Sequence, residues 1–504
     1  MSYEVVVVGA GIGGLTVAAL LAARGVSVCV LEREPEAGGC ARPFERFGYR
    51  FEPGAGLYAG WGPDGVHARV FAELPPAPPE SRRVAPAAYA VRLPDDAKVA
   101  VGGESLAEFE DGLRRAFPEC AGTAVNFYRE LGFIAAALRR AASGAPNLTT
   151  LSKLQRLKLI AGAPRAASRI LARQHDTTAR HLAGASRRFR RFIDAQLHIY
   201  AGQTSDECAY LYAATALTEP LERGLYSLRG GAAALTATLI ESIGQSSGTI
   251  RFNASALRLT YDATGHATGV TLLSGERVAA ARAVVSNLTV WDTYGKLVGT
   301  DRTPADVRAW LKGLRGRGAY VIYLGLEEAA AGRLGGDQWL CLRDWQEGQT
   351  YNAEEAQFML SLPPAWDAGR APAGRRAATA SFFTDAEQWF AYHEDESGHE
   401  TQDQRKLEKC WEWLHAAAPE LGGGAEVIET VTPRVYYEQT RRRLGLVGGV
   451  GQLPETLFGA RALTHRTHVP NLYRVGDTTF PGNGVAAVTH SALIVANEIA
   501  PHAG

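Results

Sequence analysis

The strongest constraint on the fold of this chain is its first segment, residues 3–32. Val5–Val8 are four consecutive valines, as expected for a strand that is buried on both faces of a parallel sheet. The stretch Gly9–Gly14 follows with the spacing G-x-G-x-x-G and leads into an apolar segment of helical character. A second apolar run, Val26–Leu31, ends at the acidic Glu32. Strand, glycine turn, helix, strand and acid in this order predict a dinucleotide-binding βαβ unit, whereas the glycine spacing alone would be weak evidence.

Each part of this unit has a physical role. Gly9 permits the tight turn, Gly11 lets the backbone approach a pyrophosphate, and Gly14 lets helix and strand pack closely. The helix N-terminus offers unpaired N–H groups and a positive dipole end to the phosphates. Glu32 can accept hydrogen bonds from an adenosine ribose and disfavours a 2′-phosphate. The expected nucleotide is therefore FAD or NAD rather than NADP.

Composition limits the remaining possibilities. A chain of 504 residues is too long for one core and suits two domains or one large interrupted domain. Hydrophobic residues at 46% and charged residues at 21% are globular values, and a formal net charge of +0 argues against a general nucleic-acid binder. The six cysteines are scattered without a C-x-x-C pair, so we expect reduced thiols.

The scattered cysteines predict a cytoplasmic protein, and the N-terminus agrees with this prediction. It lacks a basic region, so no signal peptide is expected. Residues 5–23 carry no charge, but their glycine cluster favours a buried strand and helix over a membrane span. No transmembrane segment is predicted elsewhere, and the histidines show no metal-binding spacing.

The segment after Glu32 favours FAD. The pair Gly38-Gly39 lets the backbone lie against a second phosphate or the flavin side of an elongated dinucleotide, and it resembles the FAD-binding extension of the amine oxidase and phytoene desaturase superfamily. Near the other end, Asn471–Asp477 reads as a strand ending in Gly-Asp, and a glycine-rich turn then leads into a helix that runs to Ile499. Both ends of the chain must lie in one domain if they bind the same cofactor, so this domain is expected to be discontinuous.

Over nearly its full length the chain resembles the phytoene desaturase-related carotenoid oxidoreductases, especially the bacterial C-3′,4′ carotenoid desaturases and the carotenoid cis–trans isomerases. The stretches that carry the resemblance are Gly38–Ala41, Gly65–Leu74, Phe192–Tyr200, Tyr210–Leu217, Gly224–Gly231 and Val475–Gly484. The resemblance implies an α/β fold: a Rossmann-type FAD-binding domain of the glutathione reductase-2 and amine oxidase type, with an inserted α+β substrate domain. It also implies FAD as cofactor and a hydrophobic polyene as substrate.

The resemblance also implies which residues hold the cofactor. They are Gly9, Gly11, Ile12, Gly13, Gly14, Glu32, Arg33, Gly38, Gly39, Cys40, Arg42, Ala256, Gly476, Asp477, Gly484 and Val485. In such proteins the backbone at the position of Ala256 lies against adenine, and the acid at the position of Asp477 accepts from a cofactor hydroxyl. The turn before Val485 then directs the N-terminus of the next helix at the flavin pyrimidine ring, where a positive dipole end stabilises reduced flavin.

Two positions depart from the family pattern. Cys40 stands where many desaturases have arginine, so a pyrophosphate contact either passes to Arg42 or is lost. The usual Phe-Asp-x-Gly is Phe51-Glu52-Pro53-Gly54 here, which leaves the contacts near the flavin open.

The expected domain division is discontinuous. The FAD-binding parts are 1–103, 225–287 and 426–504, and the substrate-domain parts are a helical 104–224 and a sheet-forming 288–425. Residues 147–195 hold eleven Lys or Arg and two Asp, and an apolar stripe from Leu151 to Ile160 runs through them. Such a basic amphipathic helix either packs on its own protein or contacts an anionic membrane surface, and the resemblance favours peripheral membrane contact.

The expected activity is an FAD-dependent oxidoreductase acting on a carotenoid-like polyene, by desaturation with hydride transfer to flavin N5 or by redox-neutral cis–trans isomerisation. A flavin amine or amino-acid oxidase and a non-catalytic flavin or carotenoid carrier are the alternatives. His198, Tyr200 and Glu219 were considered for proton transfer, but no catalytic side chain is assigned. Aromatic residues of the second insert are expected to be mostly core, with some lining a substrate tunnel; they are Trp339, Trp345, Trp366, Phe382 and Phe383.

Overall fold

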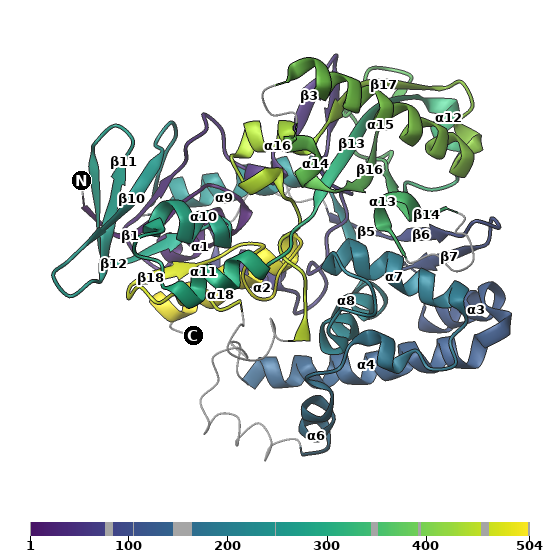
Figure 1. Cartoon of the computed structure of the whole chain (residues 1–504), viewed down its shortest axis with the longest axis horizontal. Coiled ribbons are helices and arrows are strands. Elements are labelled where there is room, and N and C mark those ends of the chain that lie inside the picture. Colours follow the sequence, from purple (N-terminus) through teal and green to yellow (C-terminus); the bar gives the residue numbers. More distant parts are fainter. Residues whose placement is uncertain are drawn as a thin grey trace.

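Two seven-stranded sheets organise the chain, one on the left of Figure 1 and one at its upper right, with a group of helices below the second. The computed structural model describes residues 2–75, 84–103, 105–144, 164–246, 248–343, 351–391, 395–454 and 463–501. Two small sheets of two strands each complete the β structure of these residues: β3 (Phe44–Arg46) with β4 (Tyr49–Phe51), and β5 (Val84–Ala87) with β8 (Leu225–Leu228).

The first sheet joins the beginning, the middle and the end of the chain. Its strands are β1 (Ser2–Val8), β2 (Val28–Leu31), β9 (Gly248–Arg251), β10 (Ala256–Tyr261), β11 (Ala267–Leu272), β12 (Arg277–Ser286) and β18 (Leu472–Arg474). The order is β10-β11-β12-β1-β2-β9, and β18 also pairs with β12. Strand β1 runs parallel to β2 and β12, and β18 runs parallel to β12. Residues more than 440 positions apart thus meet at one sheet edge.

Both faces of the first sheet are covered, which explains the unbroken run of valines. Val5 and Val7 of β1 pack in the core beneath four helices, whereas Val6 and Val8 pack in the core on the other face. The four helices are α1 (Ile12–Ala23), α2 (Val66–Glu73), α9 (Gly231–Gly244) and α18 (Val485–Ile499). The other face is covered by α10 (Val290–Asp292), η6 (Thr293–Gly299) and α11 (Ala305–Gly313). Because α1 is buried from Ile12 to Ala22, the uncharged N-terminal stretch is a core strand and helix, as expected.

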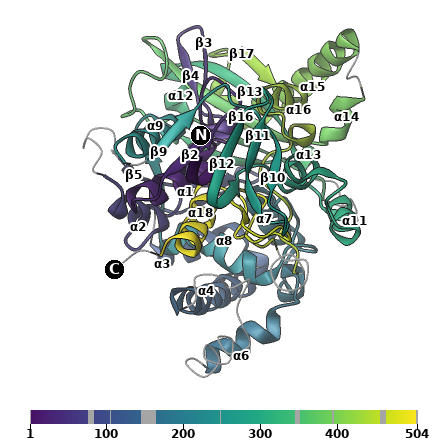
Figure 2. The ribbon, with the colours of Figure 1, turned by 90° about the vertical axis from the view of Figure 1, so that its left-hand side faces the viewer.

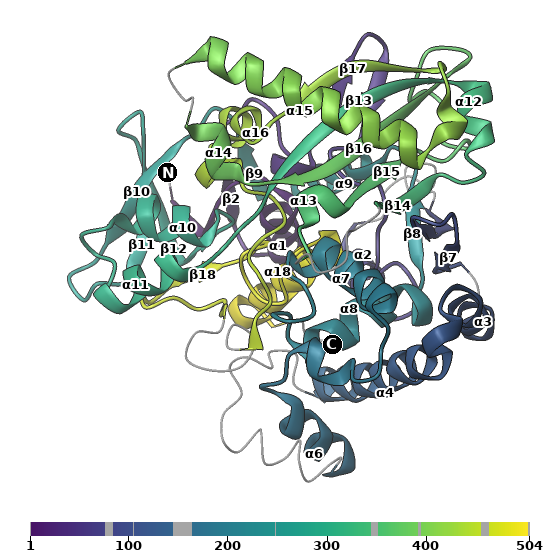
Figure 3. The ribbon, with the colours of Figure 1, turned by 45° about the vertical axis from the view of Figure 1, so that its right-hand side comes forward.

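The second sheet lies beside the first. Its strands, in the spatial order β17-β13-β16-β15-β14-β6-β7, are β17 (Ala425–Val431), β13 (Gly318–Glu327), β16 (Arg375–Thr384), β15 (Gln357–Ser361), β14 (Gln338–Leu342), β6 (Tyr89–Arg92) and β7 (Lys98–Val101). Figure 3 shows the long helix α15 crossing over this sheet. The helices that follow or cover its strands are α12 (Glu328–Arg333), α13 (Ala353–Ala356), α14 (Ala386–Phe390), α15 (Glu396–Ala417), η7 (Pro419–Leu421) and α16 (Pro433–Thr440).

Two of the expected domain limits separate strands that pair in this sheet. Strands β6 and β7 fall inside 1–103 but join β14, and β17 extends into 426–504 but pairs with β13. Tyr89 and Val91 of β6 are buried in the core that the helical group forms. These strands belong to the second sheet because their side chains are buried against distant segments of the chain. Local sequence patterns carry no information about such contacts.

The helical group packs below the second sheet. It contains α3 (Leu106–Ala116), η3 (Pro118–Cys120), α4 (Ala121–Gly144), α6 (Pro164–Arg173), η5 (Thr178–His181), α7 (Arg187–Ala201) and α8 (Tyr210–Glu222). Figure 2 shows α6 at the end of the molecule, beyond α4. The apolar stripe expected between Leu151 and Ile160 lies outside the described residues. Within the part that is described, no helix has the length and hydrophobicity to cross a bilayer. All six cysteines are free thiols.

Candidate dinucleotide site

The turn between β1 and α1 is built so tightly that side chains are excluded. Gly9 has φ +98°, a backbone conformation that favours glycine. A Cβ on Gly14 would lie 2.0 Å from the carbonyl oxygen of Gly9, and a Cβ on Gly11 would lie 2.7 Å from Nδ2 of Asn287. Glycine at these positions therefore serves close packing as well as backbone approach to a ligand.

Glu32 is directed at this turn. Its Oε2 accepts a hydrogen bond from the Ala10 N–H at 2.7 Å, and its Oε1 accepts from the Glu34 N–H at 2.9 Å. The glycine pair also reaches the turn, since the Gly38 N–H donates to the Ala10 carbonyl at 2.9 Å. Backbone amides and a carboxylate thus converge at the carboxyl end of β1 and β2, where α/β sheets bind nucleotides.

A cleft opens at this edge of the sheet. Eight of the residues predicted to hold the cofactor line it: Gly9, Gly11, Glu32, Arg33, Gly39, Cys40, Arg42 and Ala256. They come from β1, the segment after β2, the glycine loop and β10. The structure therefore brings together the N-terminal and middle pieces of the predicted site.

The other eight predicted residues lie outside the lining. Ile12, Gly13 and Gly14 begin α1, and Gly38 precedes the lining glycine of its pair. At the C-terminal end, Gly476 and Asp477 follow β18, while Gly484 and Val485 begin α18. A Cβ on Gly13 would lie 3.4 Å from Cα of Gly476, so the first and last motifs touch at these glycines. Asp477 reaches the cleft through Arg442, whose Nη2 donates to Oδ2 of Asp477 at 2.7 Å.

Two groups at the cleft were absent from the residues predicted from the sequence. Asn287 follows β12 and packs against five glycines of the two motifs: Gly9, Gly11, Gly13, Gly14 and Gly476. The sequence signal for Asn287 was its position directly after a strand that ends at this edge of the sheet. Arg442 enters between α16 and η8 (Arg443–Gly445), and no local pattern marks it.

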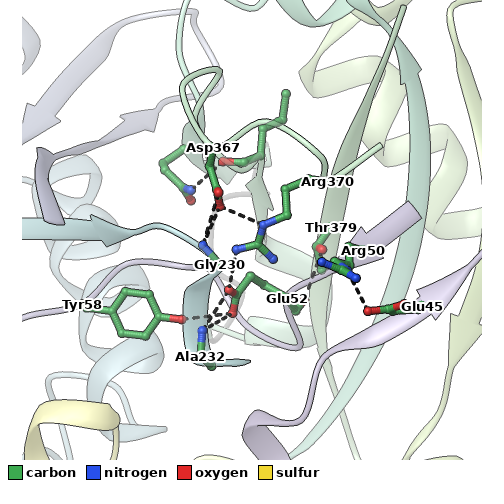
Figure 4. A network of polar contacts seen from close by, with 11 residues as sticks. Glu45, Arg50, Glu52, Tyr58, Gly230, Ala232, Asp367, Arg370 and Thr379 are labelled. Atoms are coloured by element: carbon green, nitrogen blue, oxygen red, sulfur yellow. Dashed lines mark hydrogen bonds and ion pairs between the residues drawn. The ribbon is translucent and has the colours of Figure 1, made fainter. Parts of the chain in front are cut away.

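Glu52, the departure from the family pattern, belongs to a different place. Its carboxylate accepts from the Tyr58 hydroxyl at 3.0 Å, from the Ala232 N–H at 3.1 Å and from Nη2 of Arg370 at 3.3 Å (Figure 4). Arg370 also donates to Asp367 at 2.8 Å through Nε. Burial raises the pKa of Glu52, and the charge of Arg370 partly opposes this. The network ties β4 and the start of α9 to the segment between β15 and β16.

The groups considered for proton transfer lie in the helical part, away from the cleft lining. Burial lowers the pKa of His198 to about 3, so this imidazole stays neutral at physiological pH. The Tyr200 hydroxyl donates to the Tyr89 hydroxyl at 3.1 Å, and burial raises the pKa of Tyr200 to about 12. Burial also raises the pKa of Glu219.

The aromatic residues of the second insert are partly core. Phe382 is buried and stacks on Phe358 with ring centroids 4.9 Å apart, and Trp339 is buried in the same core. The Phe383 ring lies edge-on to the His198 ring at 4.4 Å. Trp345 lies outside the described residues.

Comparison with known proteins agrees with this geometry. Residues 7–74 match the model of the NAD(P)-binding Rossmann-like domain. The chloroplastic prolycopene isomerase of Arabidopsis thaliana is 27% identical over 100% of this chain and 83% of its own length. The chain is thus similar to a prolycopene isomerase along its whole length. The all-trans-retinol 13,14-reductase of Homo sapiens is 25% identical, covering 98% of this chain and 85% of the relative.

A solved structure extends the comparison to the fold. Wild-type putrescine oxidase bound to putrescine matches 100% of each chain with a TM-score of 0.63 at 15% identity. The expected fold class, a Rossmann-type domain of the amine oxidase kind with inserted α+β structure, is confirmed. The resemblance to the carotenoid-type oxidoreductases and the prediction of an enzyme are confirmed as well.

Proposed function

We propose that the chain is an FAD-dependent oxidoreductase. The cleft fits this cofactor for three reasons: glycines stand where a Cβ would collide, Glu32 disfavours a 2′-phosphate, and the C-terminal Gly476-Asp477 meets the N-terminal motif. A site for NAD alone would need neither the additional glycine pair Gly38-Gly39 nor the C-terminal motif Gly476-Asp477. When bound, FAD would supply reversible two-electron chemistry.

The proposed substrate is a carotenoid-like polyene. The observation that carries this is the full-length similarity to prolycopene isomerase, with retinol 13,14-reductase as a second relative named for a conjugated polyene. Redox-neutral cis–trans isomerisation is the first choice. Desaturation, a net oxidation, is the second, because the reductase relative is named for a net redox change at such a chain. The likeness to putrescine oxidase is at the level of the fold and carries no amine substrate.

The chain's own residues would mainly bind and orient. The glycine turn and Glu32 would hold the adenosine diphosphate part, and the positive end of α18, beginning at Val485, would face the other end of the cofactor. Neutral His198 and protonated Tyr200 are poor acids and bases at physiological pH, because their pKa values lie far from it. Neither of these two groups is therefore assigned a role in proton transfer, and the protein is proposed to act mainly by orientation and exclusion of water.

The proposed function predicts a yellow protein that changes polyene geometry. The full-length chain is purified and its absorbance is recorded. It is then incubated with a poly-cis lycopene-type carotenoid in detergent under two conditions: anaerobically with reductant, which tests isomerisation, and in air with the flavin oxidised, which supplies the electron acceptor that desaturation needs. We expect bound FAD and a changed isomer ratio at constant mass; a red shift with loss of two hydrogens per step would indicate desaturation instead. A colourless protein that takes up no flavin, or a pigment unchanged in both isomer ratio and mass, would contradict the proposal.

We further propose that residues 147–195 contact a membrane surface from the cytoplasmic side. The described part of this range supports the proposal at α6. Leu171 of α6 and Phe133 of the neighbouring α4 are large apolar side chains that are 47% and 40% exposed. The guanidinium of Arg169 lies 4.2 Å from the centre of the Phe133 ring. Exposed apolar groups beside cations are suited to the interface of an anionic bilayer.

The membrane proposal predicts salt-sensitive binding to anionic vesicles. We expect the protein to sediment with phosphatidylglycerol-containing liposomes at low salt, and to do so several-fold less in the double variant Phe133→Ser, Leu171→Ser. Leu273→Ser is the matched control, since Leu273 is 70% exposed in the turn between β11 and β12. Equal sedimentation of the double variant and the wild type, or none with the wild type, would refute it.

A further inference from the structure

Arg442 reaches the dinucleotide cleft from a part of the chain remote from the recognised motifs. Arg442 lines the cleft together with Gly11, Glu32 and Cys40, although it lies about 400 residues further along the chain. It stands between α16 and η8, and neither the βαβ unit nor the Gly-Asp motif includes it. Its role in the proposed cofactor site is therefore set only by the tertiary structure.

The Arg442 guanidinium is held in one orientation. Its Nε donates to the Leu446 carbonyl at 2.8 Å, and its Nη2 donates to Oδ2 of Asp477 at 2.7 Å. Burial raises the pKa of the Cys40 thiol, which lines the same cleft, and the charge of Arg442 partly opposes this rise. Burial opposes the charge, but the carboxylate of Asp477 raises the pKa of Arg442, so the guanidinium stays protonated. A largely buried, oriented guanidinium loses little conformational entropy when it meets a ligand.

The other charges around the cleft make this cation significant. Lys296 is ion-paired with Asp292 at 2.8 Å and Arg33 with Glu34, as Arg442 is with Asp477, but these two cations are more exposed: their side chains are 58% and 34% exposed, against 17% for Arg442. Glu32 adds a negative charge next to the glycine turn. A diphosphate brings further negative charge into this cleft. Helix N-terminal amides offset only part of it, whereas a guanidinium can donate charge-assisted hydrogen bonds to phosphate oxygens.

We propose that Arg442 is a binding residue for the diphosphate of the dinucleotide, positioned by Asp477 and the Leu446 carbonyl. This rests on the proposed function, since it requires that the cleft binds FAD. Cys40, the position next to the glycine pair, supplies no cation, and Arg442 lines the same cleft. The positive charge near the diphosphate thus belongs to Arg442, in the C-terminal part of the chain, and not to a residue of the glycine loop.

The test compares two ligands that differ only in the diphosphate. The full-length chain, freed of bound flavin, is titrated calorimetrically with ADP and with adenosine. In Arg442→Gln we expect the Kd for ADP to rise about tenfold or more, and the Kd for adenosine to stay within about twofold. Arg442→Lys keeps the charge and should lose less ADP affinity. Arg443→Gln is the matched control, because Arg443 is exposed and does not line the cleft.

Each other result has a defined meaning. Equal weakening of ADP and adenosine in Arg442→Gln would show a merely structural role, and unchanged ADP binding would show no phosphate contact; both overturn the inference. A loss of ADP affinity in Arg42→Gln, with Arg442→Gln silent, would assign the contact to Arg42 and overturn it too. A wild-type chain that binds neither FAD nor ADP would refute the proposed function itself.

Discussion

Replacing Arg370 by methionine should destabilise the protein by about 3–5 kcal/mol, because it leaves two buried carboxylates without their counter-charge. The side chains of Arg370, Glu52 and Asp367 are only 9%, 11% and 4% exposed. Methionine keeps the apolar stem and removes the guanidinium. The loss of stability therefore measures the effect of the missing charge and not of a change in side-chain volume. Chemical denaturation followed by circular dichroism measures the change in the free energy of unfolding.

The matched control is Arg375→Met. Arg375 lies near Glu426 at 3.6 Å, but both side chains are substantially exposed, so we expect less than about 1 kcal/mol. A similar small loss in Arg370→Met would contradict the electrostatic role assigned to the network.

The loss in Arg370→Met should also depend on pH. Burial raises the folded-state pKa of Glu52, and Arg370 opposes this, so its removal raises that pKa further. A carboxyl group whose folded-state pKa exceeds its unfolded-state pKa binds more protons in the native state, and stability then falls as pH rises between the two values. The deficit should therefore be smaller near about pH 5 than near about pH 8. A deficit that grows on acidification would contradict this sign.

Replacing Gly14 by alanine should weaken cofactor binding about 100-fold. The added Cβ would lie 2.0 Å from the Gly9 carbonyl oxygen and 3.1 Å from Cβ of Asn287, so the backbone of the turn must move. Overpacking of this kind costs about 3 kcal/mol. If the displaced turn loses that much binding free energy, the affinity for FAD falls about 100-fold. Flavin absorbance of the purified variant and titration with FAD measure the effect.

Gly122→Ala provides the comparison. Gly122 is exposed in α4, and a Cβ there would meet nothing within 4 Å. Alanine should be neutral or stabilising by up to about 1 kcal/mol, because glycine is the poorer helix former. Normal flavin content in Gly14→Ala would show that the glycine turn is not part of the proposed FAD site.

Part of the cleft could be predicted because its physics is local. The segment β1–α1–β2 contains its own strand, turn and helix within about 30 residues, and the glycine spacing records steric limits that adjacent backbone imposes. The acid at the end of β2 and the glycine pair after it follow at fixed short distances, so Glu32 and Gly39 were found and do line the cleft.

Tertiary structure decided the rest, because those contacts join segments without a common pattern. Asn287 lies against five glycines only because β12 pairs with both β1 and β18. Arg442 meets Cys40 and Asp477 across three separate parts of the chain, and Glu52 meets Arg370 across the junction of the two sheets. Neighbouring residues determine turn conformation, hydrophobic periodicity and the order of the motifs. The amino-acid sequence by itself therefore determined the nucleotide-binding unit. The charged groups around that unit depend on which distant surfaces are buried together, and only the folded chain brings those surfaces into contact.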